Sequence, residues 1–223
     1  MSSWGSAPGF SNANQPSQAP ALPGFEHIRR FWDRDSQCWV AKVLPGEYYV
    51  TCANEGIGTV LGSCVSACIR DPQRGVGGIN HFMLPEDSSN GRSSWLQPEV
   101  GLSTRYGSFA MEQLINDLLK LGARRDRLEV KLFGGGKILA SMTDVGARNI
   151  AFIRNFVRVE GYRIAAENLG DIYPRRILYF PANGRVLLKR LRALESESIA
   201  IQERQYLGRL DTGPAKDDIE LFE

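Results

Sequence analysis

The chain has 223 residues, 43% of them hydrophobic and 23% charged, a composition typical of a globular protein with a substantial core. Its 27 basic and 25 acidic side chains give a formal net charge of +2, which argues against nucleic acid or an anionic membrane as a partner. No apolar run approaches the ~20 residues that span a bilayer, and the N-terminus lacks the pattern of a secretory signal. We therefore expect a cytoplasmic protein without membrane insertion.

Residues 1–24 are rich in Ser, Pro, Gly, Ala and Asn and contain no charge, which predicts a disordered N-terminal extension. We expect order to begin between residues 25 and 39. The segment EYYVT at 47–51 follows a Leu-Pro-Gly break and is predicted to be a strand.

A glycine-punctuated loop that runs into a strand is predicted over residues 56–72, with Asp71-Pro72 as the closing turn. A second apolar strand is predicted over residues 76–84. The short DPQRG connection makes the two strands antiparallel neighbours, so that the start of one lies beside the end of the other. Residues 86–104 are polar and predict a long surface loop of the kind that often covers a functional site.

The second half of the chain alternates between helix and strand patterns. Apolar residues at helical spacing predict helices over 106–121 and 144–159, each followed by a glycine. Strands are predicted over 127–133, 162–167, 176–180 and 185–190. From residue 194 onward the sequence is charged and loses its periodicity, which predicts a partly ordered tail.

This order of elements predicts an α/β (α+β) fold, a layered single domain in which helices flank a β-sheet core. The domain is expected to span residues 25–193, between the N-terminal extension at 1–24 and the C-terminal tail at 194–223.

Cysteine and histidine are the residue types here that can carry reactive chemistry. The chain contains Cys38, Cys52, Cys64, Cys68, His27 and His81. The cysteines do not form paired CxxC motifs, so neither a zinc site nor a disulfide framework is expected, and four reduced, mostly buried thiols are the simplest interpretation. We expect no metal and no organic cofactor.

Cys64 is the best placed nucleophile, because it lies where a glycine-rich loop enters a strand. Gly62 permits a close approach of the backbone, and the loop amides of Gly62 and Ser63 could face a developing oxyanion. Cys38 and Cys52 lie in less constrained surroundings. Cys68 shares a strand face with Cys64 but lies too far along it for a disulfide, so a structural role is expected.

A thiol nucleophile needs a nearby base, and His81 on the neighbouring strand could face Cys64. His27 is the weaker candidate, just after the N-terminal extension. For a lone histidine, a core residue bonded to backbone is usually the safer interpretation. From the residues alone that interpretation is narrowly preferred over a catalytic pair.

Several segments resemble the CheD family. They are LGSC at 61–64, VSACIRDP at 65–72, GGINHFMLP at 77–85, KVLPGEYYVT at 42–51, GGGKI at 134–138, GARNI at 146–150, and PRRILYF-PANGRVLLKRL at 174–191. The resemblance covers about residues 40 to 191, and its motifs are specific.

The resemblance implies the fold of toxin deamidases and papain-like thiol hydrolases. It implies a hydrolase acting on linear amides, a protein glutamine deamidase that converts particular glutamines of chemotaxis receptors to glutamate and ammonia. The implied partners are the cytoplasmic helices of these receptors and a CheC-type phosphatase.

The family's nucleophile falls on Cys64 and its base on His81. A threonine before the cysteine is the family's third member, and Thr59 is the matching residue here. It would orient the imidazole through its hydroxyl or its backbone carbonyl, or only shape the loop.

Three alternatives stay open. The first is a related thiol deamidase with a different protein substrate, and the second is a non-catalytic adaptor that binds receptors or a CheC-type partner. The third is a structural domain with a buried cysteine and histidine.

Overall fold

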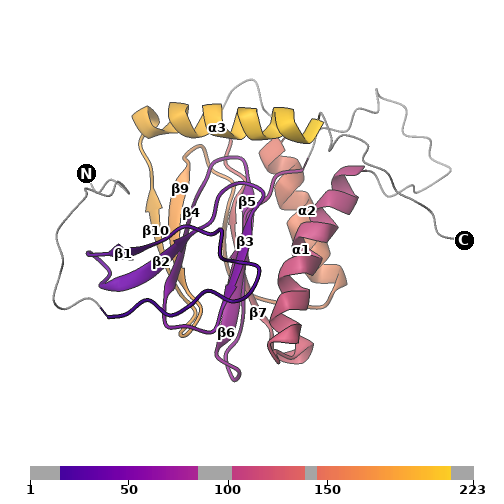
Figure 1. The fold of residues 1–223 in the computed structure, drawn as a ribbon. Helices are drawn as coiled ribbons and strands as arrows, with labels where there is room; N and C mark the ends of the chain where they lie inside the picture. Colours follow the sequence, from indigo (N-terminus) through magenta and orange to yellow (C-terminus); the bar gives the residue numbers. More distant parts are fainter. Residues whose placement is uncertain (1–15, 85–101, 139–144, 212–223) are drawn as a thin grey trace, which may run out of the picture.

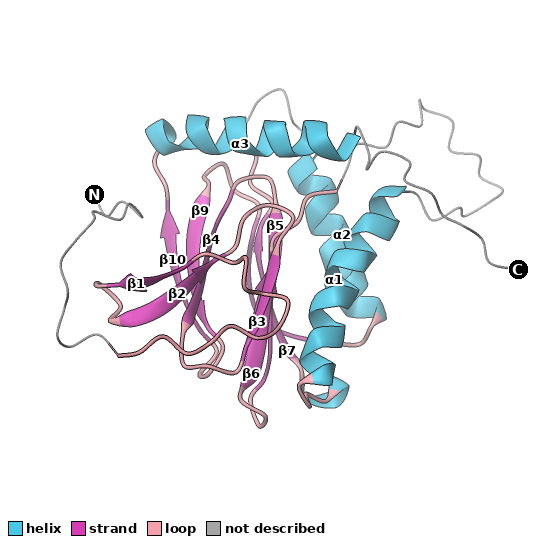
Figure 2. Ribbon diagram, in the orientation of Figure 1, coloured by secondary structure: helices cyan, strands magenta, loops and turns pink. Residues whose placement is uncertain are grey.

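The computed structural model describes residues 16–84, 102–138 and 145–211. These residues form two five-stranded β-sheets and three α-helices, with the helices outside the sheets (Figure 1, Figure 2). The layered mixture of helices and sheets confirms the predicted fold class.

The first sheet has the strand order β1-β2-β4-β9-β10. Its strands are β1 (Arg30–Asp33), β2 (Cys38–Lys42), β4 (Gly56–Leu61), β9 (Arg175–Phe180) and β10 (Arg185–Arg190). β2 and β4 are parallel, and the other neighbours are antiparallel. β4 is the central strand and ends at Leu61, three residues before Cys64.

The second sheet has the strand order β3-β6-β5-β7-β8. Its strands are β3 (Tyr48–Thr51), β6 (Val76–Asn80), β5 (Val65–Asp71), β7 (Glu129–Gly134) and β8 (Arg163–Leu169). β5 and β6 are antiparallel with Cys68 opposite Ile79, and an isolated bridge joins Val65 to Phe82. As predicted, this places the residues before β5 beside those after β6.

Two helices cover the outer face of the second sheet (Figure 1). α1 (Leu102–Lys120) contacts β3, β5 and β6, while α2 (Val145–Val159) contacts β5, β7 and β8. Of the predicted apolar stripe of α1, Met111, Leu114, Ile115 and Leu118 are buried, and Leu119 is partly buried against the core. A short 3₁₀ helix, Arg125–Arg127, leads into β7.

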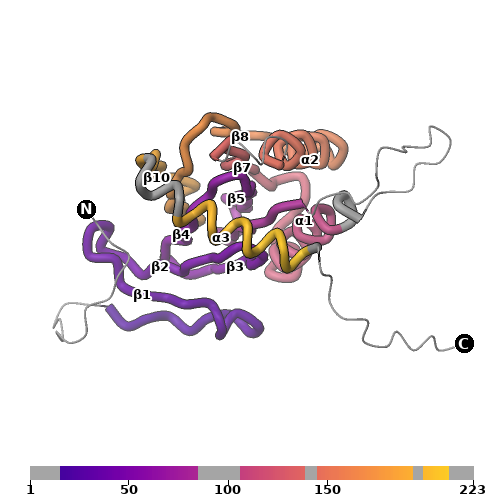
Figure 3. The backbone as a smooth tube through the Cα atoms, turned by 90° about the horizontal axis from the view of Figure 1, so that it is seen from above, coloured from indigo at the N-terminus to yellow at the C-terminus, as the bar shows by residue number. Residues whose placement is uncertain are grey.

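The third helix, α3 (Ala193–Asp211), runs across one end of both sheets, as Figure 1 and Figure 3 show from two directions. The prediction of a partly ordered tail from residue 194 missed this helix. Among the helices of the described segments, none is long and apolar enough to cross a membrane.

Three further expectations need correction. Residues 56–61 are strand β4 rather than loop, because their backbone pairs on both sides with β2 and β9. β6 ends at Asn80, so His81 follows the strand instead of lying within it. The predicted loop at 86–104 lies outside the described residues, except for 102–104, which begin α1.

The N-terminal extension also packs further than predicted. Of residues 1–24, the first fifteen lie outside the described segments, whereas Ala21 and Leu22 pack partly buried against the core. The indole N–H of Trp39 donates to the carbonyl of Pro16 over 3.0 Å. A segment without charge or periodicity can therefore still dock, because its few apolar side chains and carbonyls find partners on the sheet.

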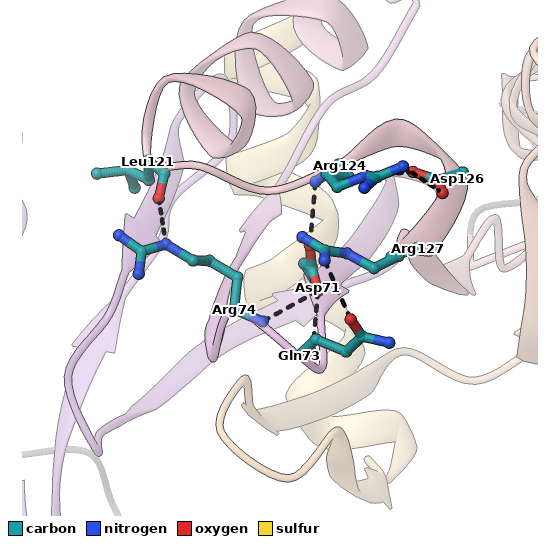
Figure 4. A network of polar contacts seen from close by, with 7 residues as sticks. All are labelled: Asp71, Gln73, Arg74, Leu121, Arg124, Asp126 and Arg127. Atoms are coloured by element: carbon teal, nitrogen blue, oxygen red, sulfur yellow. Dashed lines mark hydrogen bonds and ion pairs between the residues drawn. The ribbon is translucent and has the colours of Figure 1, made fainter.

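The turn between β5 and β6 is held by the buried carboxylate of Asp71 (Figure 4). It accepts the backbone N–H groups of Gln73 at 2.9 Å, Arg74 at 3.1 Å and Arg124 at 3.0 Å. The Arg127 guanidinium adds an ion pair at 2.7 Å. Burial alone would raise the pKa of Asp71, but these donors hold it below its ordinary value. The carboxylate ties the β5–β6 hairpin to the segment that enters β7.

We expect Asp71→Asn to lower the free energy of unfolding by ~2–4 kcal/mol, because it leaves buried donors with a weaker acceptor. The folded pKa of Asp71 lies below 3.8, so its stabilisation is complete above that pH and is lost as the pH falls through the folded value. Urea unfolding of both proteins across this range should show the difference narrowing on acidification.

Asp126→Asn is the matched control, because Asp126 pairs with Arg124 in the same region but both side chains are about two-thirds exposed, at 64% and 65%. It should change the free energy of unfolding by less than ~0.5 kcal/mol. Equal effects of the two substitutions would contradict a special role for Asp71.

Candidate active site

The loop at residues 62–64 connects β4 to β5 and carries Cys64 at its last position. Its three carbonyl oxygens accept hydrogen bonds, in chain order, from Gly136 N–H at 2.7 Å, from the Asn149 side-chain amide at 2.8 Å and from Gly135 N–H at 2.7 Å. Because a trans peptide unit is planar, its N–H points away from its C=O. Holding these carbonyls on one side therefore directs the amides of Ser63 and Cys64 to the other.

The glycines that end β7 allow this close backbone contact. Gly134 has a φ of 110°, which side chains rarely adopt, and a Cβ built there would overlap the carbonyl oxygen of Cys64. A Cβ on Gly62 would collide with the Ile138 and Glu203 side chains. The backbone contact therefore requires glycine at position 134, whereas a side chain at position 62 would have to displace the ends of the Ile138 and Glu203 side chains.

The amides of the loop all donate to the carboxylate of Glu203, a residue of α3. Gly62 N–H and Cys64 N–H donate to Oε1 at 2.8 and 3.2 Å. Ser63 donates to Oε2 twice, from its N–H at 2.8 Å and from its hydroxyl at 2.6 Å. All these groups are buried. The loop is thus a binding site for an anion, built from consecutive backbone N–H groups.

Hydrogen bonds to the segment before β3 hold the backbone of His81 beside this loop. The backbone N–H of His81 donates to the carbonyl of Glu47 at 2.9 Å, and the backbone carbonyl of His81 accepts from the N–H of Gly46 at 2.8 Å. The next residue, Phe82, exchanges two backbone hydrogen bonds with Val65 at 3.0 Å. The backbone of His81 is therefore fixed on both sides of the residue.

The imidazole of His81 is oriented by Thr59. The Thr59 hydroxyl donates to the carbonyl of Val43 at 2.7 Å, so its oxygen is left to accept from His81 Nδ1, 2.8 Å away. This places the ring proton on Nδ1. The other nitrogen, Nε2, is buried and has no hydrogen-bond partner within the described residues. It is therefore the ring nitrogen that is left as an acceptor.

Cys64, His81 and Glu203 each contribute one atom to a cluster in which all three lie within 4.8 Å of one another. These residue types can ligate a metal. Both oxygens of Glu203, however, already accept hydrogen bonds from the 62–64 loop, and the dipoles of those donors favour a negative charge. The donor set is better suited to an anion than to a cation.

Burial and the neighbouring charge decide the protonation states. Burial, followed by the negative charge of Glu203, raises the pKa of the Cys64 thiol well above its ordinary value. Burial lowers the pKa of His81 to about 3. With α3 in place, the pair is therefore a neutral thiol beside a neutral imidazole.

The structure brings together the residues singled out from the sequence as nucleophile, base and third member, namely Cys64, His81 and Thr59. Gly62 and Ser63 supply the loop amides. The other thiols and His27 are not part of the cluster: Cys68 is buried in β5, Cys38 is partly buried, and Cys52 and His27 are exposed.

The sequence reasoning missed three parts of this site. Gly134–Gly136 and Asn149 lie in the GGGKI and GARNI segments, and their inclusion in the family resemblance was the available signal. Asn149 also accepts Leu84 N–H at 2.9 Å, so one buried side chain holds two segments. Glu203 lies beyond the resemblance, and nothing in its surroundings marked it.

A cavity of about 520 Å³ lies alongside α3 and reaches Thr59 and His81. Its walls come from the segment at 42–47, from β4 and from the α3 side chains of Gln202 and Glu203. The imidazole is therefore approached from a cleft whose one wall is α3.

Comparison with known proteins identifies the family. The model of the family described as CheD chemotactic sensory transduction matches residues 83–190. A relative from Halorhodospira halophila is 51% identical over 201 residues, which cover 90% of this chain and 93% of its own. A relative from Hahella chejuensis is 46% identical over 215 residues, 96% of this chain and 100% of its own. The chain belongs to the CheD family.

Both relatives carry the name "Probable chemoreceptor glutamine deamidase CheD", as does one from Janthinobacterium that is 53% identical over 86% of this chain and 92% of its own. Among solved structures, a Neisseria meningitidis protein aligns over 59% of this chain and 62% of its own, with 8% identity and a TM-score of 0.33. A likeness that weak carries no inference.

The hydrogen bond from His81 to Thr59 predicts an unusual histidine spectrum. In protein carrying isotope-labelled histidine, the ring-nitrogen shifts of His81 should show a protonated Nδ1 and an unprotonated Nε2 at neutral pH. Because burial lowers its pKa to about 3, the ring should stay neutral as the pH falls to about 4. A signal from His81 that titrates near its ordinary pKa would contradict this assignment.

Proposed function

We propose that this chain is a protein glutamine deamidase that uses Cys64 as nucleophile and His81 as base. The observation that carries the proposal is a thiol with a free imidazole nitrogen nearby and three backbone N–H groups directed at one anion site beside it. This is the arrangement that acyl transfer from an amide requires. The names of its close relatives support the same activity.

The first half of the reaction forms a thioester. His81 Nε2 takes the proton of Cys64, and the sulfur attacks the side-chain carbonyl carbon of the glutamine. The carbonyl oxygen becomes negative and is stabilised by the amides of the 62–64 loop. When the C–N bond breaks, the imidazolium gives its proton to the departing ammonia.

The second half hydrolyses the thioester. His81 now accepts a proton from water, the hydroxide attacks the same carbon, and the C–S bond breaks with return of the proton to Cys64. The products are a glutamate side chain and ammonia. In both halves, Thr59 keeps the ring proton on Nδ1, so that Nε2 remains the nitrogen that exchanges protons.

The substrates in this proposal are glutamines of chemotaxis receptors, as the relatives' names indicate. The family resemblance adds that these glutamines lie on the receptors' cytoplasmic helices. The proposal places the protein in the cytoplasm, where those helices lie. A CheC-type phosphatase stays a predicted partner, on the resemblance alone.

Cys64→Ala should lower the rate of receptor deamidation by about a thousandfold or more, because no thioester can form. The measurement is mass spectrometry of receptor peptides for conversion of glutamine to glutamate, together with ammonia release. Receptor binding should remain.

Cys52→Ala is the matched control, because Cys52 is an exposed thiol outside the cluster. It should retain full activity. Undiminished deamidation by Cys64→Ala would exclude the proposed nucleophile.

Thr59→Val should reduce kcat by about tenfold or more, since it keeps the volume but removes the acceptor of His81 Nδ1 and the donor to Val43. Thr59→Ser restores the hydroxyl and should recover most of the rate. Histidine ring-nitrogen shifts recorded on both variants separate this positioning role from a packing defect. If the two variants have equal kcat, the hydroxyl does not orient the imidazole.

A further inference from the structure

The buried face of α3 is a helical stripe with a carboxylate at its centre. Its members are Ile199, Ala200, Glu203, Tyr206 and Leu207. Their spacing of three and four residues is that of an amphipathic helix packed on a protein surface. A charged side chain is costly in the middle of such a stripe unless it finds strong partners.

The partners of Glu203 are the groups that the proposed reaction uses. Its two oxygens accept from the amides of Gly62, Ser63 and Cys64 and from the Ser63 hydroxyl. A glutamate side chain is also what deamidation of a glutamine leaves behind. Glu203 therefore lies in the anion site as a product side chain would.

This arrangement closes the site. Cys64 has no exposed surface, and His81 is only 2% exposed. The amides that would stabilise an oxyanion are already occupied by Glu203. A second carbonyl group cannot bind to the same three donors, so a substrate side chain and Glu203 exclude each other.

We propose that α3 is an intramolecular stand-in for the helix that carries the reacting glutamine, and that it must leave before a receptor helix can bind. The inference rests on the proposed function for the identity of the substrate. That the Glu203 carboxylate must leave the loop follows from its contacts alone, and the burial of Cys64 and His81 adds the displacement of the helix that carries it.

The contacts of α3 also describe the partner. A helix in the same place presents its glutamine where α3 has Glu203, and apolar side chains on the turns before and after it, as α3 has Ala200 and Leu207. Beside Leu207, the hydroxyl of Tyr206 forms a hydrogen bond with the hydroxyl of Tyr106 on α1. A bound helix would therefore also contact α1 at this position. The fitting substrate is an amphipathic helix with its glutamine on the apolar face.

The departure of α3 also changes the protonation of Cys64. The charge of Glu203 is the second cause, after burial, that raises the pKa of Cys64. Departure of α3 removes both causes together, because it exposes the thiol and takes the carboxylate away. Cys64 becomes more reactive when the substrate's place is vacated.

The first test is the rate at which iodoacetamide alkylates Cys64 in the full-length chain, followed by peptide mass spectrometry. Glu203→Ala and Glu203→Met should each raise this rate by about tenfold or more, because neither side chain can accept from the loop amides. Arg204→Ala changes an exposed residue on the same helix and should leave the rate unchanged.

The other cysteines provide controls within the same molecule. Alkylation of the exposed Cys52 shows that the reagent is active. Alkylation of Cys68, which is buried in β5, would show that the core has unfolded. The proposal is overturned if Cys64 is alkylated equally slowly in wild type and in Glu203→Met while Cys68 stays protected. If Glu203→Ala exposes Cys68, that variant has unfolded and Glu203→Met alone decides.

The second test makes α3 a substrate. Glu203→Gln places an amide where the product carboxylate lies, so Cys64 should hydrolyse it and return the mass of the wild-type chain. The double variant with Cys64→Ala should keep its amide. A receptor cytoplasmic fragment incubated with the same preparations reports the proposed function separately.

The two failures can be distinguished. An amide that survives in Glu203→Gln, while the same preparation deamidates the receptor fragment, overturns the assignment of Glu203 to the product position. If neither the Glu203→Gln side chain nor the receptor fragment is deamidated, the deamidase function is refuted. If Glu203→Met still raises the alkylation rate of Cys64, the occlusion of the site by α3 is supported all the same. Faster receptor deamidation by Glu203→Ala than by wild type supports both.

Discussion

The geometry of the candidate active site depends on how the peptide units of residues 62–64 are held. Gly135, Gly136 and Asn149 bind the carbonyls of this loop from one side, and planarity of the peptide units then directs its N–H groups to the other. The supporting groups come from the end of β7 and from α2, so both sheet pairing and helix packing are needed to form them. In the proposed reaction, an oxyanion site built in this way would not have to reorganise as charge develops.

Three strands position the residues of the site. β4 carries Thr59 and leads into the loop, β5 begins immediately after Cys64, and the end of β6 delivers His81. The three strands belong to two different sheets, so the catalytic groups of the proposed reaction meet where the sheets face each other. α3 then covers this end of both sheets (Figure 3), and Glu203 connects the cover to the loop.

Much of this could be predicted from the sequence, because the relevant signals are local. The LGSC motif, the short DPQRG turn and the position of His81 were enough to bring Cys64 and His81 together through antiparallel pairing. The strand β4 was missed because its glycines resemble a loop, and only pairing on both sides makes GIGTVL extended. The helix α3 was missed because Glu203 interrupts its apolar stripe, and the charge looks unfavourable until the loop amides are seen.

The sequence by itself determined the family, the order of most elements and the candidate pair Cys64 and His81 that the family resemblance implies, since motifs and periodicity are written in neighbouring residues. Only the tertiary structure decided the hydrogen-bond direction at Thr59, the support of the loop by Asn149, and the occupation of the anion site by Glu203. These contacts join residues separated by 22, 86 and about 140 positions. No local pattern encodes them, because each partner acquires its role only when folding brings it to a group that would otherwise be buried without a hydrogen bond.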